Sequence, residues 1–500
     1  MIKNKLAWLV GLALASVALF LFFRLYSLNK IPVFVDEAIY VRWSQVMRTE
    51  PTLRFLPLSD GKQPLFMWMT MPSLKFISDP LVAGRIVSVF AGLGSMIGIG
   101  VLTFLLFSDP FIALFSSLLY AIVPFFMFFD RMALADSLLA MFGVWALVFA
   151  IKYAKTLTTE YAIYLGFAIG GGLLTKSPAM IFYIWSLLAL VFFLDLKNIH
   201  AKNIGKLLWG LFLVLVISQV MYGILRLGVG FQMIGARNQD YVYSIREVLS
   251  HPLSPLIGNL KTTGNWLFLL LSPTVLILGV LGYLNTKTRR QFFFLLLISF
   301  LPLIFQASIA KVYTSRYIIY ATLPLLPLAG LGLHWLFCRK GILIKSSIAL
   351  FLSVPLLLTT VYLLNPGIAP MSYDMSSGYL QEWTAGTGQK EVADYLLKEE
   401  AKGSKIVVFT EGTFGTLPDG LQIYTEGHKD ITIVGSTPNI YEIPEGLLNT
   451  DPENQRYYVL NSSRNHLPAS EMEKLELIKE YPKMTRLDGS HESLLFFRLK

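Results

Sequence analysis

The chain has 500 residues, of which 54% are hydrophobic and 15% are charged, and its mean hydropathy is +0.58. A soluble protein of this length carries about 25% charged residues, and the apolar excess here lies in long runs, so the composition excludes an ordinary soluble enzyme and favours a polytopic membrane protein. The single cysteine, Cys338, excludes an internal disulfide and a cysteine-rich metal site.

The charge is unevenly distributed along the chain. Residues 1–365 contain 12 acidic and 29 basic residues, whereas residues 366–500 contain 20 acidic and 13 basic residues. We therefore expect a membrane domain over 1–365 and a soluble domain over 366–500. The basic residues lie in short loops between apolar runs, which is typical of a membrane protein and gives no reason to expect a nucleic-acid partner.

The first apolar run, residues 6–23, follows Lys3 and Lys5 and is long enough to cross a bilayer core of ~30 Å. No small-residue cleavage site follows it, so we expect a retained span rather than a signal peptide. Ten further runs raise the expected number of spans to eleven, which places the two ends of the chain on opposite sides. These runs lie at about 83–107, 111–129, 134–151, 161–175, 178–194, 207–227, 264–284, 292–310, 317–337 and 342–364.

The loop charges indicate the orientation of these spans. On this topology the inner segments hold 13 Lys and Arg residues and three Asp and Glu residues, in agreement with the positive-inside rule. We therefore expect a multi-pass plasma-membrane protein with a cytoplasmic N-terminus and an extracytoplasmic 366–500 domain. The inner segments are the N-terminus, 108–109, 152–160, 195–206, 285–291 and 338–345.

Two long outer segments and the tail complete the predicted architecture. Residues 29–82 form the first outer segment, and residues 228–263 form the second, which has little apolar periodicity and is expected to be a loop. The tail alternates helical and strand patterns, which predicts a small α/β domain. Its expected helices are 390–401 and 469–478, and its expected strands are 405–409, 430–434, 456–460 and 493–498.

Two adjacent carboxylates, Asp36 and Glu37, follow Pro32 shortly after the first apolar run. Acidic residues suit the N-terminus of a helix, so the pair can simply begin a helix along the membrane surface. A carboxylate at the water boundary of a membrane protein can also accept a proton in catalysis. The residues alone leave both interpretations open.

Several more charged residues lie at the predicted outer ends of spans. Such residues are costly beside a bilayer and usually line a water-filled cavity, and outer cations run against the positive-inside bias, so an anionic head group is a candidate partner. Asp136 heads a long apolar helix and must be hydrated or paired. Most of the cations also have a simpler explanation. A solvated turn would explain Lys62 taken alone, and interfacial snorkelling would explain Arg131. A turn residue that faces lipid head groups would explain Lys176 and Arg316. With the acidic pair, the set is Asp36, Glu37, Lys62, Asp130, Arg131, Asp136, Lys176, Lys311 and Arg316.

The order and spacing of five motifs over roughly residues 1–340 are informative together. The motifs are Asp36-Glu37, Gly61-Lys62-Gln63-Pro64-Leu65, Arg131 with Asp136-Ser137, Leu174-Thr175-Lys176-Ser177-Pro178, and Arg316-Tyr317 followed by Leu323-Pro324-Leu325-Leu326-Pro327. They resemble the polytopic type C glycosyltransferases, and more narrowly the superfamily of protein O-mannosyltransferases and lipid A aminoarabinose transferases. Gln63 departs from the pattern, because that family usually has two prolines after the lysine.

The resemblance implies a mainly α-helical membrane enzyme that transfers a sugar from a polyprenyl-phosphate donor to a hydroxyl acceptor at the outer face. It implies that Asp36 is the catalytic base, with Glu37 as its neighbour and alternative. The expected phosphate-binding residues are Lys62, Arg131, Lys176 and Arg316, and the expected cavity or acceptor residues are Asp136 and Tyr40. No dense cluster of metal ligands stands out in the sequence, so no metal residues are assigned, and a divalent metal stays an open alternative.

Two other classes of protein fit parts of the pattern. A transporter or lipid-linked sugar flippase would also need charges near the membrane, but such proteins often show internal repeats, and none is clear here. A non-catalytic membrane scaffold whose tail binds a partner is the third interpretation. The sequence leaves the sugar and the acceptor open among protein, lipid and glycan hydroxyls.

Overall fold

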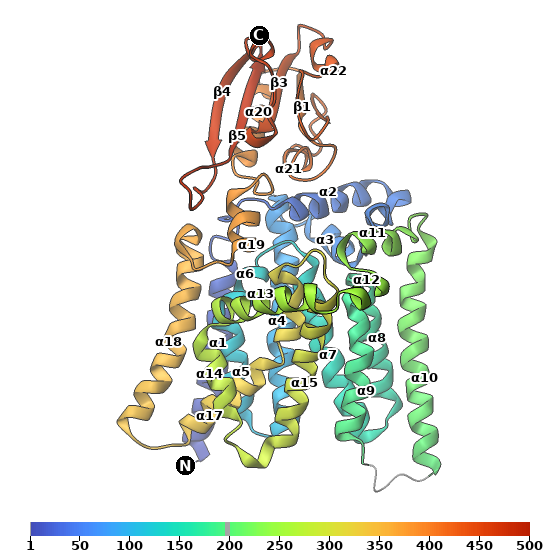
Figure 1. Ribbon diagram of the computed structural model, residues 1–500, viewed down its shortest axis with the longest axis vertical. Helices are drawn as coiled ribbons and strands as arrows, with labels where there is room; N and C mark the ends of the chain where they lie inside the picture. Colours follow the sequence, from blue (N-terminus) through green and yellow to red (C-terminus); the bar gives the residue numbers. More distant parts are fainter. Residues whose placement is uncertain (1, 196–200) are drawn as a thin grey trace. The chain divides into compact units, whose positions relative to one another are not determined.

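The computed structural model describes residues 2–195 and 201–500, and these residues form two compact units (Figure 1). Unit 1 consists of Met1–Tyr26, Thr52–Phe66 and Val87–Ser372. Unit 2 consists of Ser27–Pro51, Met67–Ile86 and Tyr373–Lys500. The C-terminal part of the chain therefore shares a unit with two short N-terminal segments, one of which carries the acidic pair.

Unit 1 is a helical bundle. One of its helices, α4 (Pro80–Phe107), begins in unit 2 and continues into unit 1. All eleven predicted apolar runs are largely helical in the structure, and the runs 111–129, 264–284 and 317–337 are each divided by a break. The other helices of the bundle are α1 (Ile2–Leu25), α5 (Pro110–Ile122), α6 (Pro124–Phe129), α7 (Ala135–Thr156), α8 (Thr159–Thr175), α9 (Ile181–Phe193), α10 (Ala201–Gly223), α13 (Leu253–Leu270), α14 (Pro273–Gly282), α15 (Arg289–Ile309), α16 (Ile319–Thr322), α17 (Leu325–Phe337) and α18 (Ile342–Leu364).

The helices identify a multi-pass membrane protein but do not confirm a count of eleven spans. Within the described ranges, six helices are long and apolar enough to cross a membrane, and two bent pairs raise the number to eight. The bends measure 98° between α13 and α14 and 56° between the 315–322 segment and α17. Prolines at 124, 273 and 324 stand at the breaks, because proline lacks the N–H that would continue the helix.

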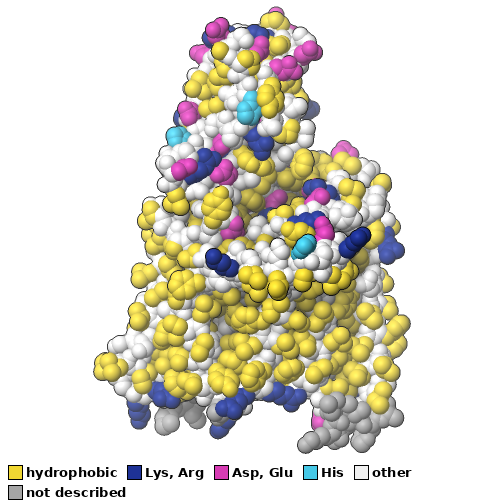
Figure 2. All heavy atoms as spheres, in the orientation of Figure 1, with side chains coloured by type: hydrophobic (Ala, Val, Ile, Leu, Met, Phe, Trp, Pro, Cys, Tyr) yellow, Lys and Arg dark blue, Asp and Glu magenta, His cyan; other side chains and the backbone are white. Residues whose placement is uncertain are grey.

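The exterior of unit 1 matches a bilayer environment. In the face that Figure 2 shows, hydrophobic side chains cover its helices as a broad belt, and Lys and Arg side chains gather at one end of that belt. The N-terminus and the turn between α17 and α18 lie at the same end of the unit (Figure 1). Of the predicted inner segment 195–206, residues 196–200 lie outside the described residues.

The prediction of a loop over 228–263 is wrong, because this segment is largely helical. It contains α11 (Met233–Tyr241), α12 (Ile245–Ser250) and the first half of α13. A capping box begins α12: the Ser244 hydroxyl accepts from the Glu247 amide, and the Glu247 carboxylate accepts from the Ser244 amide. A helical period is present in this segment, and the loop prediction missed it. Apolar residues recur at helical spacing in α12 and at the start of α13, namely Ile245, Val248 and Leu249, and Leu253, Leu256, Ile257 and Leu260.

Unit 2 contains a five-stranded sheet in the order β2-β1-β3-β5-β4. The first three strands of that order are parallel, and β5 and β4 are antiparallel to their neighbours. Alternating side chains build a core on each face, one of them beneath α20 (Gln389–Glu400). The strands are β1 (Ile406–Thr410), β2 (Ile431–Gly435), β3 (Gln455–Asn461), β4 (Leu475–Pro482) and β5 (Ser493–Leu499).

The α/β prediction for the tail is confirmed apart from one element. The helix expected at 390–401 and the four expected strands are present. The helix expected at 469–478 is wrong: α23 covers only Ala469–Met472, and β4 then begins at Leu475. The Glu- and Lys-rich sequence of β4 has helical propensity, but pairing with β5 along the sheet edge decides its conformation.

The remaining helices of unit 2 are short. α2 (Val35–Thr49) carries the acidic pair, and α3 (Leu65–Ser73) begins at the end of a unit 1 segment and continues into unit 2. Residues after the last bundle helix form α19 (Tyr373–Ser376) and a π-helical turn (Ser377–Gln381). α21 (Asp419–Gln422) follows β1, and α22 (Glu445–Leu448) follows β2.

Candidate active site

The acidic pair lies in the first turn of α2, and its two carboxylates have different surroundings. Asp36 is partly exposed, whereas the Glu37 side chain is fully buried. Glu37 accepts a hydrogen bond of 3.0 Å from the backbone amide of Phe34, which precedes the helix. Adjacent residues on a helix point about 100° apart, so the side chains of Asp36 and Glu37 point in different directions.

Glu37 is paired with an arginine that sequence reasoning missed. Arg85 Nη2 lies 2.7 Å from Glu37 Oε2, Arg85 Nε donates to Oε1 at 2.8 Å, and neither side chain is exposed. The same guanidinium donates to the backbone carbonyls of Leu28, Ile31 and Pro32. Arg85 therefore fixes the chain that leads into α2, and the position of a lone arginine at the start of an apolar run was the signal available in the sequence.

Tyr40 lies one turn after Asp36 on α2, a spacing that places the two residues on the same face of the helix. Its side chain is buried, and its ring stacks on Trp43 with centroids 6.2 Å apart. The structure thus positions Tyr40 as part of the aromatic face of α2.

In unit 1, Lys176 and Asp136 form the centre of a cationic cluster. Lys176 Nζ lies 2.6 Å from Asp136 Oδ1. The Lys176 side chain is 24% exposed to solvent, and the Asp136 side chain is 5% exposed. The ammonium also lies 4.3 Å from the ring centroid of Tyr317, a cation–π distance. Asp136, at the head of α7, is thus paired, as its place on an apolar helix requires.

Lys62 joins this cluster from the segment that precedes α3. Its ammonium donates to the Tyr241 hydroxyl at 3.3 Å. Gln63 donates to the Ser177 hydroxyl at 2.8 Å and ties the turn after Gly61 to the turn that carries Lys176. The non-proline residue that departs from the family pattern therefore makes a contact between two cation-bearing turns.

α11 supports the Lys62 turn from the other side. Arg237 Nη2 pairs with Asp60 Oδ1 at 2.9 Å. Gly61 has a φ of +69°, and a Cβ there would lie 2.7 Å from the Met233 carbonyl oxygen, so glycine meets two requirements at once. The segment that was expected to be a loop thus contributes to the surroundings of Lys62.

Arg316 is the third cation of the cluster. Its guanidinium lies 5.4 Å from the Tyr317 ring centroid, and both Arg316 and Lys62 interact electrostatically with Lys176. Three cations close to one carboxylate leave an excess of positive charge. Such a group can bind a phosphate, with arginine as a bidentate donor and lysine as a point charge.

Arg131 has different partners. Its Nη1 donates to the carbonyl oxygens of Phe23, Arg24 and Tyr26 at 2.8–3.1 Å, so it caps the C-terminal end of α1. Next to it, Arg24 and Asp130 form a buried ion pair at 3.2 Å, and Tyr120 and Ser137 donate to the same carboxylate. These contacts indicate that Arg131 and its neighbours hold helices together.

No three His, Cys, Asp or Glu side chains are placed to hold a metal ion within residues 2–195 and 201–500. Unit 2 carries the partly exposed carboxylate of Asp36, and unit 1 carries the cations Lys62, Lys176 and Arg316.

The fold has known counterparts among membrane enzymes. ArnT from Cupriavidus metallidurans bound to undecaprenyl phosphate is 13% identical, covers 98% of this chain and 98% of its own, and superposes with a TM-score of 0.56. Apo ArnT gives a TM-score of 0.53 at 13% identity, with 99% and 98% covered. The archaeal oligosaccharyltransferase AglB from Archaeoglobus fulgidus, in complex with an inhibitory peptide and a dolichol-phosphate, is 14% identical, with 91% of this chain and 70% of AglB covered and a TM-score of 0.52.

These similarities define the class: a polytopic membrane protein with the type C glycosyltransferase fold, as the motifs predicted. A family model described as dolichyl-phosphate-mannose-protein mannosyltransferase matches residues 61–222, a stretch that includes Lys62, Asp136 and Lys176. None of the curated proteins matches the chain.

Proposed function

We propose that this protein transfers a sugar from a polyprenyl-phosphate donor to a hydroxyl acceptor at the outer face of the plasma membrane. The observation that carries the proposal is the cluster of Lys62, Lys176 and Arg316 around Asp136, in a chain with the type C fold. Solved structures of this fold hold undecaprenyl phosphate in ArnT and a dolichol-phosphate in AglB, which supports a lipid phosphate as the ligand of the cations.

The role of the cations is to stabilise the leaving group. When the bond between the anomeric carbon and the phosphate oxygen breaks, the departing lipid phosphate gains negative charge, and fixed cations stabilise that charge in the transition state. Lys176 donates to the Asp136 carboxylate, and Lys62 donates to the Tyr241 hydroxyl. Both lysines are therefore oriented before the donor binds. Arg131 takes part in helix capping, and the phosphate is assigned to the other three cations.

Asp36 serves the acceptor. The acceptor hydroxyl loses its proton as its oxygen attacks the anomeric carbon, and a carboxylate can take up that proton. The oxygens of Glu37 are occupied by Arg85 and by the Phe34 amide, whereas Asp36 remains partly exposed. Asp36 is therefore the better candidate for the base, and Glu37 is assigned to holding the turn.

The test is transfer by the purified full chain in lipid nanodiscs. Synthetic polyprenyl-phosphate sugars with different hexoses and pentoses would be offered with peptide, lipid and glycan acceptors, and products would be identified by mass spectrometry. We expect at least one donor to be consumed and its sugar to appear on an acceptor hydroxyl. Translocation of a lipid-linked sugar across the bilayer without any transfer would instead identify a flippase and overturn the proposal.

A further inference from the structure

The residues just before Asp36 are paired with the segment that leads into the C-terminal sheet. Phe34 forms an antiparallel bridge with Ala385, in which the Val35 amide donates to the Thr384 carbonyl at 3.0 Å and the Gly386 amide donates to the Val33 carbonyl at 2.7 Å. The Phe34 ring packs against Tyr379 with centroids 4.4 Å apart. All of these residues belong to unit 2.

The bridge depends on a close approach at Gly386. A Cβ at this position would lie 2.4 Å from Val33 Cγ1 and 2.7 Å from the Val33 carbonyl oxygen. Distances this short require the two segments to separate. The spacing of the bridge therefore needs glycine at 386.

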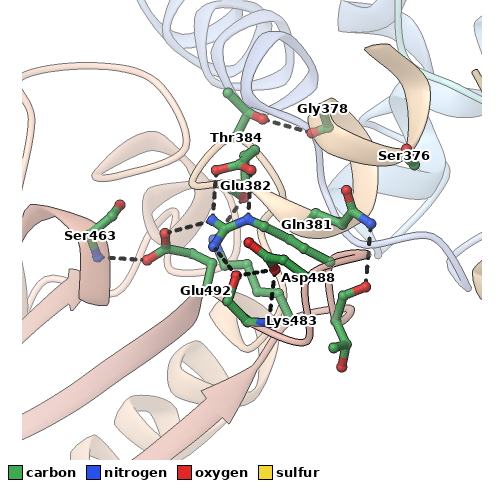
Figure 3. A network of polar contacts seen from close by, with 12 residues as sticks. Ser376, Gly378, Gln381, Glu382, Thr384, Ser463, Lys483, Asp488 and Glu492 are labelled. Carbon is green, nitrogen blue, oxygen red and sulfur yellow. Dashed lines mark hydrogen bonds and ion pairs between the residues drawn. The ribbon is translucent and has the colours of Figure 1, made fainter. Parts of the chain in front are cut away.

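The C-terminal side of the bridge is anchored to the sheet by two cations. Arg486 donates to both carboxylate oxygens of Glu382 at 2.9 Å, and Lys483 donates to the Glu382 backbone carbonyl at 3.1 Å. Figure 3 shows Glu382 and Glu492 directed at the same guanidinium. Lys483 and Glu492 belong to the sheet side, where the Lys483 amide donates to the Glu492 carbonyl.

The anchor continues into the core of the sheet. Lys483 is buried and also donates to the side-chain oxygen of Asn461, the last residue of β3. Asn461 in turn donates through its backbone and its side chain to the carboxylate of Glu411, which follows β1. A chain of hydrogen bonds thus runs from the central parallel strands to the backbone that holds Val35.

The far half of α2 rests on the same domain. Gln45 donates to the Ile423 carbonyl at 2.8 Å, and Arg48 pairs with Glu426 at 2.9 Å, both just after α21. The helix that carries Asp36 is therefore held to the α/β domain at its first turn and near its end.

We propose that the C-terminal α/β domain is the element that positions the catalytic turn, and that Gly386 and Lys483 are the positioning residues through which it holds Asp36. The inference rests on the proposed role of Asp36 as base. A displacement of about 1 Å in a catalytic group can reduce turnover about 10²-fold, so an element that fixes the backbone on both sides of Asp36 affects catalysis without contacting substrate.

The test compares two glycine variants of the full chain. In Gly386→Ala the new Cβ collides with Val33, whereas in Gly378→Ala it meets only Phe34 at 3.6 Å, an ordinary contact. We expect Gly386→Ala to accelerate hydrogen exchange at the Val35 amide and to lower kcat at least tenfold with an unchanged donor KM, while Gly378→Ala changes neither. Lys483→Met should reproduce the Gly386→Ala result from the sheet side, at a thermal stability that is measured in parallel.

The outcomes separate this inference from the proposed function. Unchanged exchange at Val35 in both Gly386→Ala and Lys483→Met would overturn the anchoring. Faster exchange with unchanged kcat would overturn the positioning role. Full turnover in Asp36→Asn would remove Asp36 as the base, and with it the catalytic purpose of the turn, whereas no transfer by the wild-type chain would remove the proposed function. In either case the exchange measurement still decides whether the domain holds Val35.

Discussion

Glu37 and Arg85, 48 positions apart in the chain, form a bidentate ion pair with no exposed side-chain surface. Two charges this deeply buried lose their hydration, and the pair is tolerated because both carboxylate oxygens and the guanidinium nitrogens have partners. The Arg85 guanidinium donates both to the Leu28 carbonyl and to the Glu37 carboxylate, so it links the two ends of the segment 28–37. The backbone that leads to Asp36 is therefore built on an interaction within unit 2.

The first prediction concerns this pair. Glu37→Gln leaves the buried Arg85 charge uncompensated, which should lower the free energy of unfolding by about 3–5 kcal/mol. The double variant Glu37→Leu with Arg85→Met should recover only part of that loss, because it removes both charges but leaves the carbonyls of Leu28, Ile31 and Pro32 without the Arg85 donor. Thermal and denaturant unfolding of the purified protein measure both effects, and a Glu37→Gln variant as stable as the wild type would contradict the burial of the pair.

The second prediction concerns Asp36 itself. Asp36→Asn keeps the shape of the side chain and removes its basicity, so turnover should fall at least about 10²-fold while donor binding survives. Asp394→Asn, an exposed carboxylate on α20, is the matched control and should be silent. The assay is transfer from a synthetic polyprenyl-phosphate sugar at matched folding. Near-normal turnover in Asp36→Asn would exclude it as the base.

Hydropathy and strand alternation predict most of the elements, because the bilayer and the sheet impose regular periods on the sequence. They fail where tertiary contacts decide the conformation. β4 is a strand although its residues favour a helix. The segment 228–263 is a different case, because apolar residues at helical spacing within 245–260 were a signal for its helices. The kinks near Pro273 and Pro324 also divide apolar runs that appear continuous in the sequence.

The site shows the same division. Family motifs single out Lys62, Lys176 and Arg316, and the structure places Lys62 and Arg316 within electrostatic range of Lys176. They give no hint that Arg85 pairs with Glu37, because that contact joins two segments separated by the whole of 52–66. Long-range pairing of this kind needs the fold and cannot be obtained from local spacing.

The third prediction concerns the cations. Lys62→Met, Lys176→Met and Arg316→Gln should each weaken donor binding by about 1–3 kcal/mol, the cost of a lost charged hydrogen bond. Arg316→Lys should restore only part of the loss if the contact is bidentate. Lys261→Met, an exposed lysine on α13, is the control. Titration of the donor should show a lower affinity in these three variants than in Lys261→Met. Normal donor affinity in Lys62→Met, Lys176→Met and Arg316→Gln would place the phosphate elsewhere.

The fourth prediction concerns orientation. The positive-inside bias of the inner segments predicts that residues 366–500 face outward. In a Cys338→Ser background, Ser470→Cys should react with an impermeant maleimide on intact cells, and Thr158→Cys should react only after permeabilisation. Both positions are exposed. The reverse labelling pattern would invert the topology and move the proposed reaction to the cytoplasmic face.

The last prediction concerns the pH dependence of the C-terminal domain. Burial raises the pKa of the Glu411 carboxyl from its ordinary value of 4.5 to about 7, although the bonds from Asn461 oppose the shift. Between these two values Glu411 binds more protons in the folded domain than in the unfolded chain. Its contribution to stability is therefore fully present below about pH 4.5 and is lost as the pH rises through 7.

A shift of this size corresponds to at most about 3–4 kcal/mol, at about 1.4 kcal/mol per pKa unit. Burial also lowers the pKa of Lys483 to about 8, so that lysine changes stability only above the window of Glu411. We therefore expect the unfolding temperature of this domain to be higher at pH 5 than at pH 7.5. Glu411→Gln should reduce the difference, and the remainder comes in part from Asp419, whose pKa burial raises to about 6. Calorimetry of the full chain at several pH values measures the difference, and an equal difference in the wild type and in Glu411→Gln would contradict the titration of Glu411 in this window.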